Sequence, residues 1–415
     1  MSREGEQPAR FGEVFAVGEF RALFSGQVLS IGGDQLARVA LALLVFDRTK
    51  SAALTALTYA LTFLPDLVGG PLLSGLADRF RRRELMVATD LARAVLVGLM
   101  ALPGMPFVAL AGLLVAVQLL AAPFNAARAA VLPDILDGDR FVVGQGVINI
   151  SYQAAQLAGY VGGGVVVRFT GTSAALGIDA ATFLVSALLV RFGLRDRPAP
   201  TDERAAGRQK TTLTSLREGA SLVWGNRMLR ALVLVACVSG CYVVAEGLAV
   251  PYADELGGGP LVAGLLFAAP PAGNVVGMVI LTRLVPPPLR RRLIGPLAVG
   301  ACAVLTGCAA GPGIAVTIVL FALSGVGAAY HTVASAEFVR AVPGAQRGQA
   351  FGLAVTSLRV SQGLGVVVAG LFADGVAPSL VVACAGALGV VVALLAARSL
   401  GRAYAGTTSP VGVTH

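Results

Sequence analysis

The sequence predicts an all-helical membrane protein with twelve transmembrane helices, and two observations support this prediction. Its 415 residues are 56% hydrophobic and only 13% charged, with a mean hydropathy of +0.79. That composition leaves too little polar surface for a water-soluble globule. The apolar residues also gather in long runs, and a run of roughly 20 residues is enough to cross a bilayer core of about 30 Å.

Twelve apolar runs are long enough to span a membrane. They cover approximately residues 20–46, 51–77, 85–103, 106–124, 142–167, 172–192, 228–250, 260–282, 293–310, 313–335, 348–373 and 378–397. Between the sixth and seventh runs the apolar pattern stops, and a Pro-containing polar stretch indicates an exposed linker. Residues 213–224 within it have the spacing of an amphipathic helix on the inner membrane face.

These features predict four parts of the chain. They are a six-helix half over residues 1–192, a cytoplasmic linker with an amphipathic helix over 193–227, a second six-helix half over 228–397 and a cytoplasmic tail over 398–415. A basic triplet follows the second helix of each half, at residues 81–83 and 290–292. This repetition predicts that the two halves are pseudo-symmetric.

The distribution of basic residues predicts the orientation. Most of the 32 Lys and Arg residues fall in segments that lie inside if the N-terminus is inside, as the positive-inside rule requires. The net charge of +9 therefore reports orientation rather than a nucleic-acid partner. We expect a multi-pass protein of the inner (plasma) membrane with both termini in the cytoplasm, and no cleaved signal peptide at the polar N-terminus.

Composition and motifs also argue against several function classes. The five Cys residues all lie in apolar runs and the chain has only two His residues, so neither disulfides nor a metal site are expected. Neither Lys50 nor Lys210 follows the Gly of a phosphate-binding loop, which argues against ATP hydrolysis. We therefore expect no enzyme activity and no cofactor, and an ion gradient as the energy source.

The loop between the second and third predicted helices carries the most specific pattern. A small residue, three positions, Asp-Arg and then a basic pair are matched by Ser74, Asp78, Arg79, Arg82 and Arg83. This pattern resembles the signature loop of major facilitator transporters. Ser74 and Arg81 replace glycines of the usual pattern, as in the macrolide-efflux and enterobactin-exporter branch of drug:proton antiporters. Further matching segments follow in order along the chain: Gly33-Asp34, Ala127-Arg128, residues 132–134, 179–186 and 347–352.

The first predicted helix carries a polar face with two charges. Gln27, Ser30, Asp34 and Arg38 follow a 3-4-4 spacing, which places them on one side of a helix. A charge at mid-bilayer costs roughly 2.5 to 3.5 kcal/mol on insertion scales, so this face should line water. Asp34 and Arg38 are candidates for proton coupling and substrate binding. The alternative is an i,i+4 pair in which they only satisfy each other.

The second predicted helix offers a similar stripe of Thr55, Tyr59, Thr62 and Asp66. Asp66 follows Pro65 near mid-depth and is the second candidate proton or substrate site. A structural hydrogen bond to a neighbouring helix is the alternative for this acid. Tyr59 is expected to line the cavity.

A third set of charges lies toward the inner ends of the helices, where the resemblance implies a gate that breaks when the protein opens inward. Asp90 and Arg93 lie near the cytoplasmic end of the third predicted helix, and a structural role is favoured for them. Asp179 in the sixth is expected to hold helices together. The predicted gate comprises Asp78, Arg79, Arg82, Arg83, Asp90, Arg93 and Arg128.

The remaining candidates are polar residues within apolar runs. Glu246 and Arg359 of the second half join Asp34, Asp66 and Arg38 as candidates for proton coupling or substrate binding, whereas His331 is favoured as a hydrogen-bonded helix residue. The predicted cavity lining consists of Gln27, Tyr59, Asn149, Gln153, Gln156, Tyr242, Asn274, His331 and Gln362. The fifth predicted helix carries an uncharged polar stripe of Gln145, Asn149, Tyr152, Gln153, Gln156 and Tyr160. The glycines beside it, at positions 159 and 162–164, resemble an antiporter motif, but Tyr160 replaces its Pro.

The resemblance implies a proton-coupled secondary transporter that exports hydrophobic or amphipathic small molecules, such as antibiotics, by alternating access. Its partners would be the small-molecule substrate, protons and the lipid bilayer, and a monomer is expected. One alternative is an exporter of a siderophore or self-made metabolite, or a nutrient importer of the same fold. A membrane enzyme or non-transporting receptor is a further alternative. It would need a nucleophile and base or a large soluble domain, and the sequence shows neither.

Overall fold

The computed structural model describes residues 11–63, 73, 76–197, 220–343 and 346–407. In these ranges the chain forms helices joined by short turns. It divides into two compact units. Unit 1 comprises residues 1–45 and 64–209, and unit 2 comprises residues 46–63 and 210–415. The hairpin segment 46–63 is therefore grouped with the second unit although unit 1 sequence flanks it on both sides.

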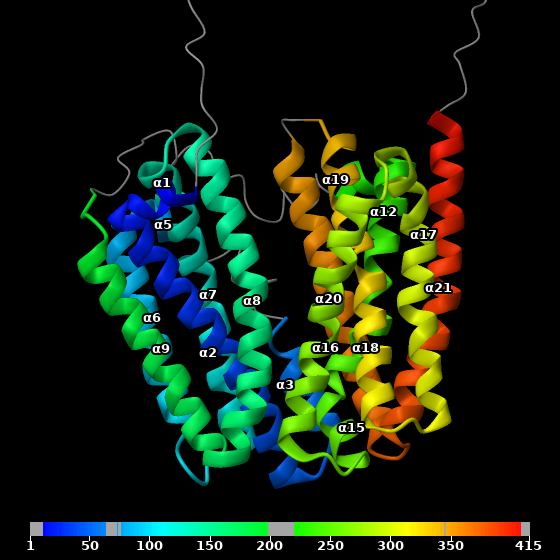
Figure 1. Ribbon diagram of the computed structural model, residues 1–415, viewed down its shortest axis with the longest axis horizontal. Coiled ribbons are helices and arrows are strands. Elements are labelled where there is room, and N and C mark those ends of the chain that lie inside the picture. The colour runs from blue at the N-terminus through cyan, green and yellow to red at the C-terminus, as the bar shows by residue number, and fades with distance from the viewer. Residues whose placement is uncertain (1–10, 64–72, 74–75, 198–219, 344–345, 408–415) are drawn as a thin grey trace, which may run out of the picture. The chain divides into compact units, whose positions relative to one another are not determined.

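Unit 1 is a bundle of long helices (Figure 1). Its elements are α1 (Phe11–Ala16), α2 (Gly18–Thr49, as far as Val45), α5 (Leu76–Arg79), α6 (Arg82–Met100), α7 (Phe107–Ile135), α8 (Gly138–Thr170) and α9 (Thr172–Gly193). The helix α6 packs against both α7 and α9. This packing brings the charges of α6 into the interior of the bundle.

One end of unit 1 is closed by an apolar core. Phe20, Met86, Phe124 and Leu132 are buried there with residues of α1, α8 and α9. The rings of Phe20 and Phe24 stack with centroids 5.7 Å apart. Burial of such side chains contributes about 1.5 to 3 kcal/mol each relative to exposure in water, and here it fixes the helix ends that carry the charged loop.

Unit 2 contains the end of α2 and α3 (Ala52–Ala60), followed by a chain of helices (Figure 1). These are α12 (Arg227–Cys237), α13 (Ser239–Tyr242), α14 (Val244–Gly247), α15 (Ala249–Glu255), α16 (Gly259–Val279), the π-helical turn η1 (Ile280–Leu284), α17 (Pro287–Ala303), the 3₁₀ segment η2 (Val304–Ala310), α18 (Ile314–Ala328), α19 (Tyr330–Ala341), α20 (Arg347–Ala373) and α21 (Pro378–Thr407). Several sequence runs predicted as one span are thus interrupted, notably at α12–α15.

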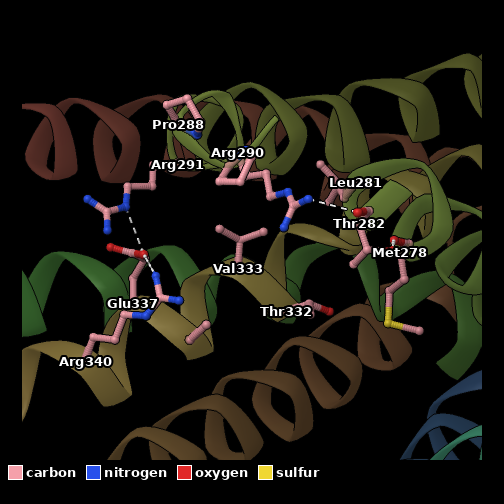
Figure 2. A pocket seen from close by; sticks show the side chains of 12 residues that line it. Met278, Leu281, Thr282, Pro288, Arg290, Arg291, Thr332, Val333, Glu337 and Arg340 are labelled. Carbon is pink, nitrogen blue, oxygen red and sulfur yellow. Dashed lines mark hydrogen bonds and ion pairs between the residues drawn. The ribbon is translucent and has the colours of Figure 1, made fainter. Parts of the chain in front are cut away.

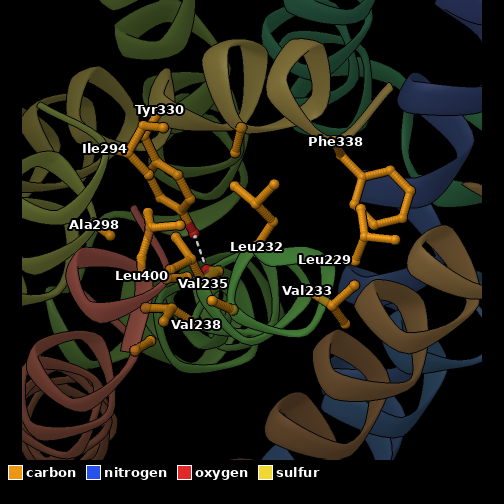
Figure 3. Packing of buried hydrophobic residues seen from close by; sticks show 14 of the residues in the cluster. Leu229, Leu232, Val233, Val235, Val238, Ile294, Ala298, Tyr330, Phe338 and Leu400 are labelled. Carbon is orange, nitrogen blue, oxygen red and sulfur yellow. Dashed lines mark hydrogen bonds between the residues drawn. The ribbon is translucent and has the colours of Figure 1, made fainter. Parts of the chain in front are cut away.

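Small residues let the helices of unit 2 approach closely. A side chain at Gly273 of α16 would overlap the backbone of Ala322 in α18, and one at Gly325 would overlap the backbone of Pro270. In lipid the hydrophobic effect does not drive helices together, so close van der Waals packing at small residues stabilises their association instead. The core at one end of the unit includes Leu232, Ile294 and Phe338. It also holds Tyr330, which donates a 3.0 Å hydrogen bond to the Val235 carbonyl (Figure 3).

Within the described residues, nine helical segments are long and apolar enough to cross a membrane. The helices α6 and α8 are also long, at 19 and 33 residues, but more polar. The predicted second span, 51–77, lies partly outside the described residues, as does most of the predicted amphipathic helix at 213–224. The all-helical prediction is confirmed, while the count of twelve spans and the boundaries of the two halves stay predictions.

Candidate functional site

Unit 1 holds an ion pair between two helices in its interior. The Arg93 guanidinium of α6 donates to both carboxylate oxygens of Asp34 in α2, at 3.1 Å each. Arg93 is 4% exposed and Asp34 is 26% exposed. The guanidinium also lies over the Phe183 ring of α9, 4.0 Å from its centroid. Arg93 therefore joins three helices, and Asp34 has a partner outside its own helix.

Two further carboxyl groups surround the same arginine. Asp90, one turn before Arg93, is fully buried 3.8 Å from it, and neither of its oxygens has a hydrogen-bond partner among the described residues. Asp179 of α9 is 1% exposed and accepts a 3.3 Å hydrogen bond from Thr182. A side chain at Gly33 would overlap both Asp179 and Thr182, so the glycine allows Asp179 to lie beside Asp34.

The charges of this group, Asp34, Asp90, Arg93 and Asp179, do not balance. One guanidinium cannot neutralise three carboxylates, and unpaired charge is costly in a site shielded from water. Asp34 is the most exposed of the three acids, whereas Asp90 and Asp179 are almost fully buried.

The other polar residues of α2 contact α7 and α8. Arg38 donates a 3.1 Å hydrogen bond to the Tyr160 hydroxyl of α8, and Arg128 of α7 donates a 2.8 Å bond to Gln27. Earlier in α8, Asn149 is exposed, and Gln153 and Gln156 are half-buried. The polar face predicted for the first helix is thus held by three neighbouring helices rather than by its own residues alone.

The loop charges of unit 1 form a second, separate group at the ends of α6, α7 and α9. Arg82 makes a 2.7 Å ion pair with Asp134, and Arg83 lies 3.3 Å from Asp196. Arg79 is exposed at the end of α5, and the side chain of Asp78 lies outside the described part of the chain. Of the residues predicted for one gate, Arg82 and Arg83 belong to this loop group, whereas Asp90 and Arg93 belong to the interior group and Arg128 contacts Gln27.

Unit 2 brings Tyr59 and Glu246 together. The Tyr59 hydroxyl of α3 donates a short hydrogen bond to the Glu246 carboxylate of α14. The Tyr59 ring lies 5.3 Å from Phe63 and 5.8 Å from Phe267, centroid to centroid. Arg359 of α20 lies over Phe63 at 5.5 Å. The Glu246 carboxylate, the Arg359 guanidinium and three aromatic rings thus lie in one region of unit 2.

The remaining candidates of unit 2 make other contacts. The Tyr242 hydroxyl and His331 Nε2 are 2.7 Å apart, and the His331 ring stacks on Tyr330 at 4.3 Å. Gln362 accepts a 3.4 Å hydrogen bond from Arg359, and Asn274 is half-buried in α16. Asp66 lies outside the described residues.

Sequence reasoning left several of these contacts out. The sequence predicts that Asp179 holds helices together and places Tyr160 on the polar stripe of the fifth helix, but it indicates no partner for either residue. Phe183, Phe63 and Phe267 were not singled out, because an aromatic residue in an apolar run has no signal of its own. The spacing of Asp179 and Thr182, one turn apart in an apolar helix, was the available clue to a buried polar cluster.

Comparisons with known proteins identify the family. The sequence model of the Major Facilitator Superfamily matches residues 23–315. The chain belongs to the major facilitator superfamily. It is 29% identical to the uncharacterized MFS-type transporter YvqJ of Bacillus subtilis (strain 168) over 61% of this chain and 62% of that protein. It is 26% identical to the uncharacterized MFS-type transporter YfiS of the same organism, over 90% of this chain and 91% of that one.

A solved structure supports the same fold. A variant of the nucleoside transporter NupG superposes with a TM-score of 0.75 at 14% identity, covering 93% of this chain and all of that one. At such low identity the likeness concerns the major facilitator fold alone. Membership of the superfamily identifies the chain as a multi-pass membrane protein.

Proposed function

We propose that this major facilitator protein is a proton-coupled exporter of hydrophobic or amphipathic small molecules, working by alternating access in the inner membrane with both termini in the cytoplasm. The observation that carries the proposal is the excess of carboxyl groups around Arg93. A buried group that is neutral only when protonated can bind and release protons as its access to solvent changes. A purely structural ion pair would need only one acid.

The exchange step follows from the contacts of Asp34. While Asp34 is ionised, Arg93 holds it at 3.1 Å. Protonation of Asp34 removes the charge that Arg93 binds, which weakens this contact between α2 and α6 and leaves Arg93 beside the carboxyl group of Asp90 on its own helix, 3.8 Å away. Proton uptake in unit 1 thereby changes the contacts between α2 and α6, which is the kind of two-state element that alternating access requires.

The residues around Glu246 support the substrate class. A carboxylate hydrogen-bonded to Tyr59 and bordered by Phe63 and Phe267 matches a molecule that combines positive charge with apolar rings. We propose that lipophilic cations are among the exported compounds. Asp66 remains the second proposed coupling acid.

Transport of a fluorescent lipophilic cation into inside-out vesicles tests the proposal. An imposed gradient, acidic inside, should drive accumulation, and collapsing it with a proton ionophore should abolish accumulation. Asp34→Asn and Asp66→Asn should each reduce gradient-driven uptake by roughly tenfold or more, whereas Asp47→Asn, at an exposed acid outside both groups, should not. Uptake that ignores the gradient, or that is unchanged in Asp34→Asn, would refute proton coupling.

A further inference from the structure

A pocket in unit 2 gathers positive charge at the turn that connects η1 with α17. It encloses about 470 Å³ between η1, the start of α17 and α19. Its lining includes Arg290, Arg291 and Arg340 with a single carboxylate, Glu337 (Figure 2). With one acid for three arginines, the lining carries a net charge of about +2 at neutral pH, since arginine is always protonated.

Glu337 forms ion pairs with two of the three arginines. Arg291 Nε lies 2.9 Å from the Glu337 carboxylate, and Arg340 Nη1 lies 3.1 Å from the same oxygen. Glu337 is 8% exposed, but the two arginines are 52% and 69% exposed. Figure 2 shows them on opposite sides of the carboxylate. The buried acid thus orients two guanidinium groups without neutralising both.

The third arginine is positioned by the backbone. Arg290 donates through Nε to the Val285 carbonyl at 2.8 Å and through Nη2 to the Thr282 carbonyl at 2.9 Å. These acceptors belong to the π-helical turn and the residue after it, where the helix ends. Arg290 makes no ion pair within the described residues of the chain, so its charge is available to a ligand.

Large apolar side chains on η1, α16 and α17 are exposed beside the arginines. Leu284 is 74% exposed, Val279 is 54% exposed and Leu289 is 44% exposed. In a membrane protein such a surface contacts lipid chains. Arginine is the preferred partner of phosphate because its fork of donors matches the oxygens, and basic pockets at the ends of transmembrane helices suit anionic lipid headgroups.

We propose that this pocket binds a phosphate group, carried by an anionic phospholipid whose acyl chains lie against the apolar side chains of η1 and α16. Arg290 and Arg291 approach the phosphate from α17 and Arg340 approaches it from α19. Lipid binding here would hold the α17 and α19 ends together. This inference does not depend on the transported substrate or on proton coupling.

Lipid retention by the purified protein tests the proposal. The protein in mild detergent is incubated with equal amounts of phosphatidylglycerol and phosphatidylcholine, and bound lipid is counted by native mass spectrometry. Each arginine of the pocket that contacts the bound headgroup is expected to contribute roughly a fivefold preference for anionic lipid. Arg291→Gln/Arg340→Gln, which keeps hydrogen-bond donors for Glu337, should therefore lower phosphatidylglycerol binding roughly 25-fold.

The control is Arg398→Gln/Arg402→Gln, which removes two exposed arginines of α21 outside the pocket and should leave binding within about twofold. Glu337→Gln removes the competing acid and should strengthen phosphatidylglycerol binding. Equal effects of the two double variants, or weaker binding in Glu337→Gln, would overturn the proposal. Inorganic phosphate displacing the lipid at equal concentration would instead assign the pocket to a soluble anion and overturn the lipid assignment.

Discussion

The Arg93 guanidinium contacts both oxygens of Asp34 at 3.1 Å while standing 3.8 Å from the buried carboxyl of Asp90. One base is thus shared by two acids on different helices. Through these contacts and the Phe183 ring, Arg93 connects α6 with α2 and α9.

Removal of Arg93 should destabilise unit 1 strongly. In Arg93→Ala the acids lose their only ion-pair partner among the described contacts, and such a loss typically costs about 3 to 5 kcal/mol. The midpoint of thermal unfolding in detergent should fall, and adding Asp90→Asn should recover part of the loss. Arg168→Ala, at an exposed arginine in the last turn of α8, is the matched control. An unchanged midpoint in Arg93→Ala would show that the acids are not held by this arginine.

The Tyr59 hydroxyl should matter for transport of lipophilic cations. Tyr59→Phe keeps the ring contacts with Phe63 and Phe267 but removes the donor to Glu246. A hydrogen bond to a charged group is worth about 1.5 to 3 kcal/mol, so the concentration for half-maximal uptake should change by roughly tenfold or more. Tyr152→Phe, at an exposed tyrosine of α8, should leave uptake unchanged. Equal uptake by both variants would remove Tyr59 from the proposed substrate region.

The contact of α3 with α20 should open during each transport cycle. The Ser51 hydroxyl donates to Asp374 at 3.0 Å, the Ala53 amide donates to it at 3.1 Å, and Gly370 lies against Ala53. Because unit 1 sequence flanks residues 46–63 on both sides, alternating access should pull this segment away from α20.

A disulfide across that contact tests the idea. Ala53→Cys/Gly370→Cys, oxidised in a background with the native cysteines replaced by serine, should stop transport, and a reducing agent should restore it. Each single-cysteine variant serves as its control. Full transport by the cross-linked protein would mean that α3 and α20 stay together throughout the cycle.

The close approach of α16 and α18 should tolerate no added side chain. Gly273→Ala places a methyl group in the backbone of Ala322, and overpacking of this kind costs about 1 to 3 kcal/mol. We expect a lower unfolding midpoint for Gly273→Ala. Gly300→Ala, in α17 where a methyl group meets no atom within 4 Å, should be neutral or slightly stabilising, since alanine favours helix. The reverse order of the two midpoints would contradict the packing described.

The sequence predicts the helices and the family, but it does not predict which residues the charged side chains contact. Apolar runs and the loop at residues 75–85 were sufficient for the fold class, since span length and charge placement are local properties. The sequence predicts Asp34 as an acid near mid-depth on a face that lines water, with Arg38, four residues away, as the alternative partner. Its actual partner, Arg93, lies 59 positions further along the chain, and only the packing of α2 against α6 and α9 brings the two together.

The same limit applies to Glu246 and Tyr59, which were named separately as candidates. They lie 187 positions apart, and no periodicity connects them. The aromatic residues around them carry no polar signal, so this region could be assembled only from the structure.

The most direct test of the account is the proton count on substrate binding. The purified protein in weakly buffered detergent is mixed with a saturating lipophilic cation while a pH indicator records proton release. Proton-coupled export predicts release of about one proton per protein by the wild type, no release by Asp34→Asn, and normal release by Asp47→Asn. Substrate binding without proton release in the wild type, or undiminished release in Asp34→Asn, would contradict the role of the Asp34–Arg93 pair.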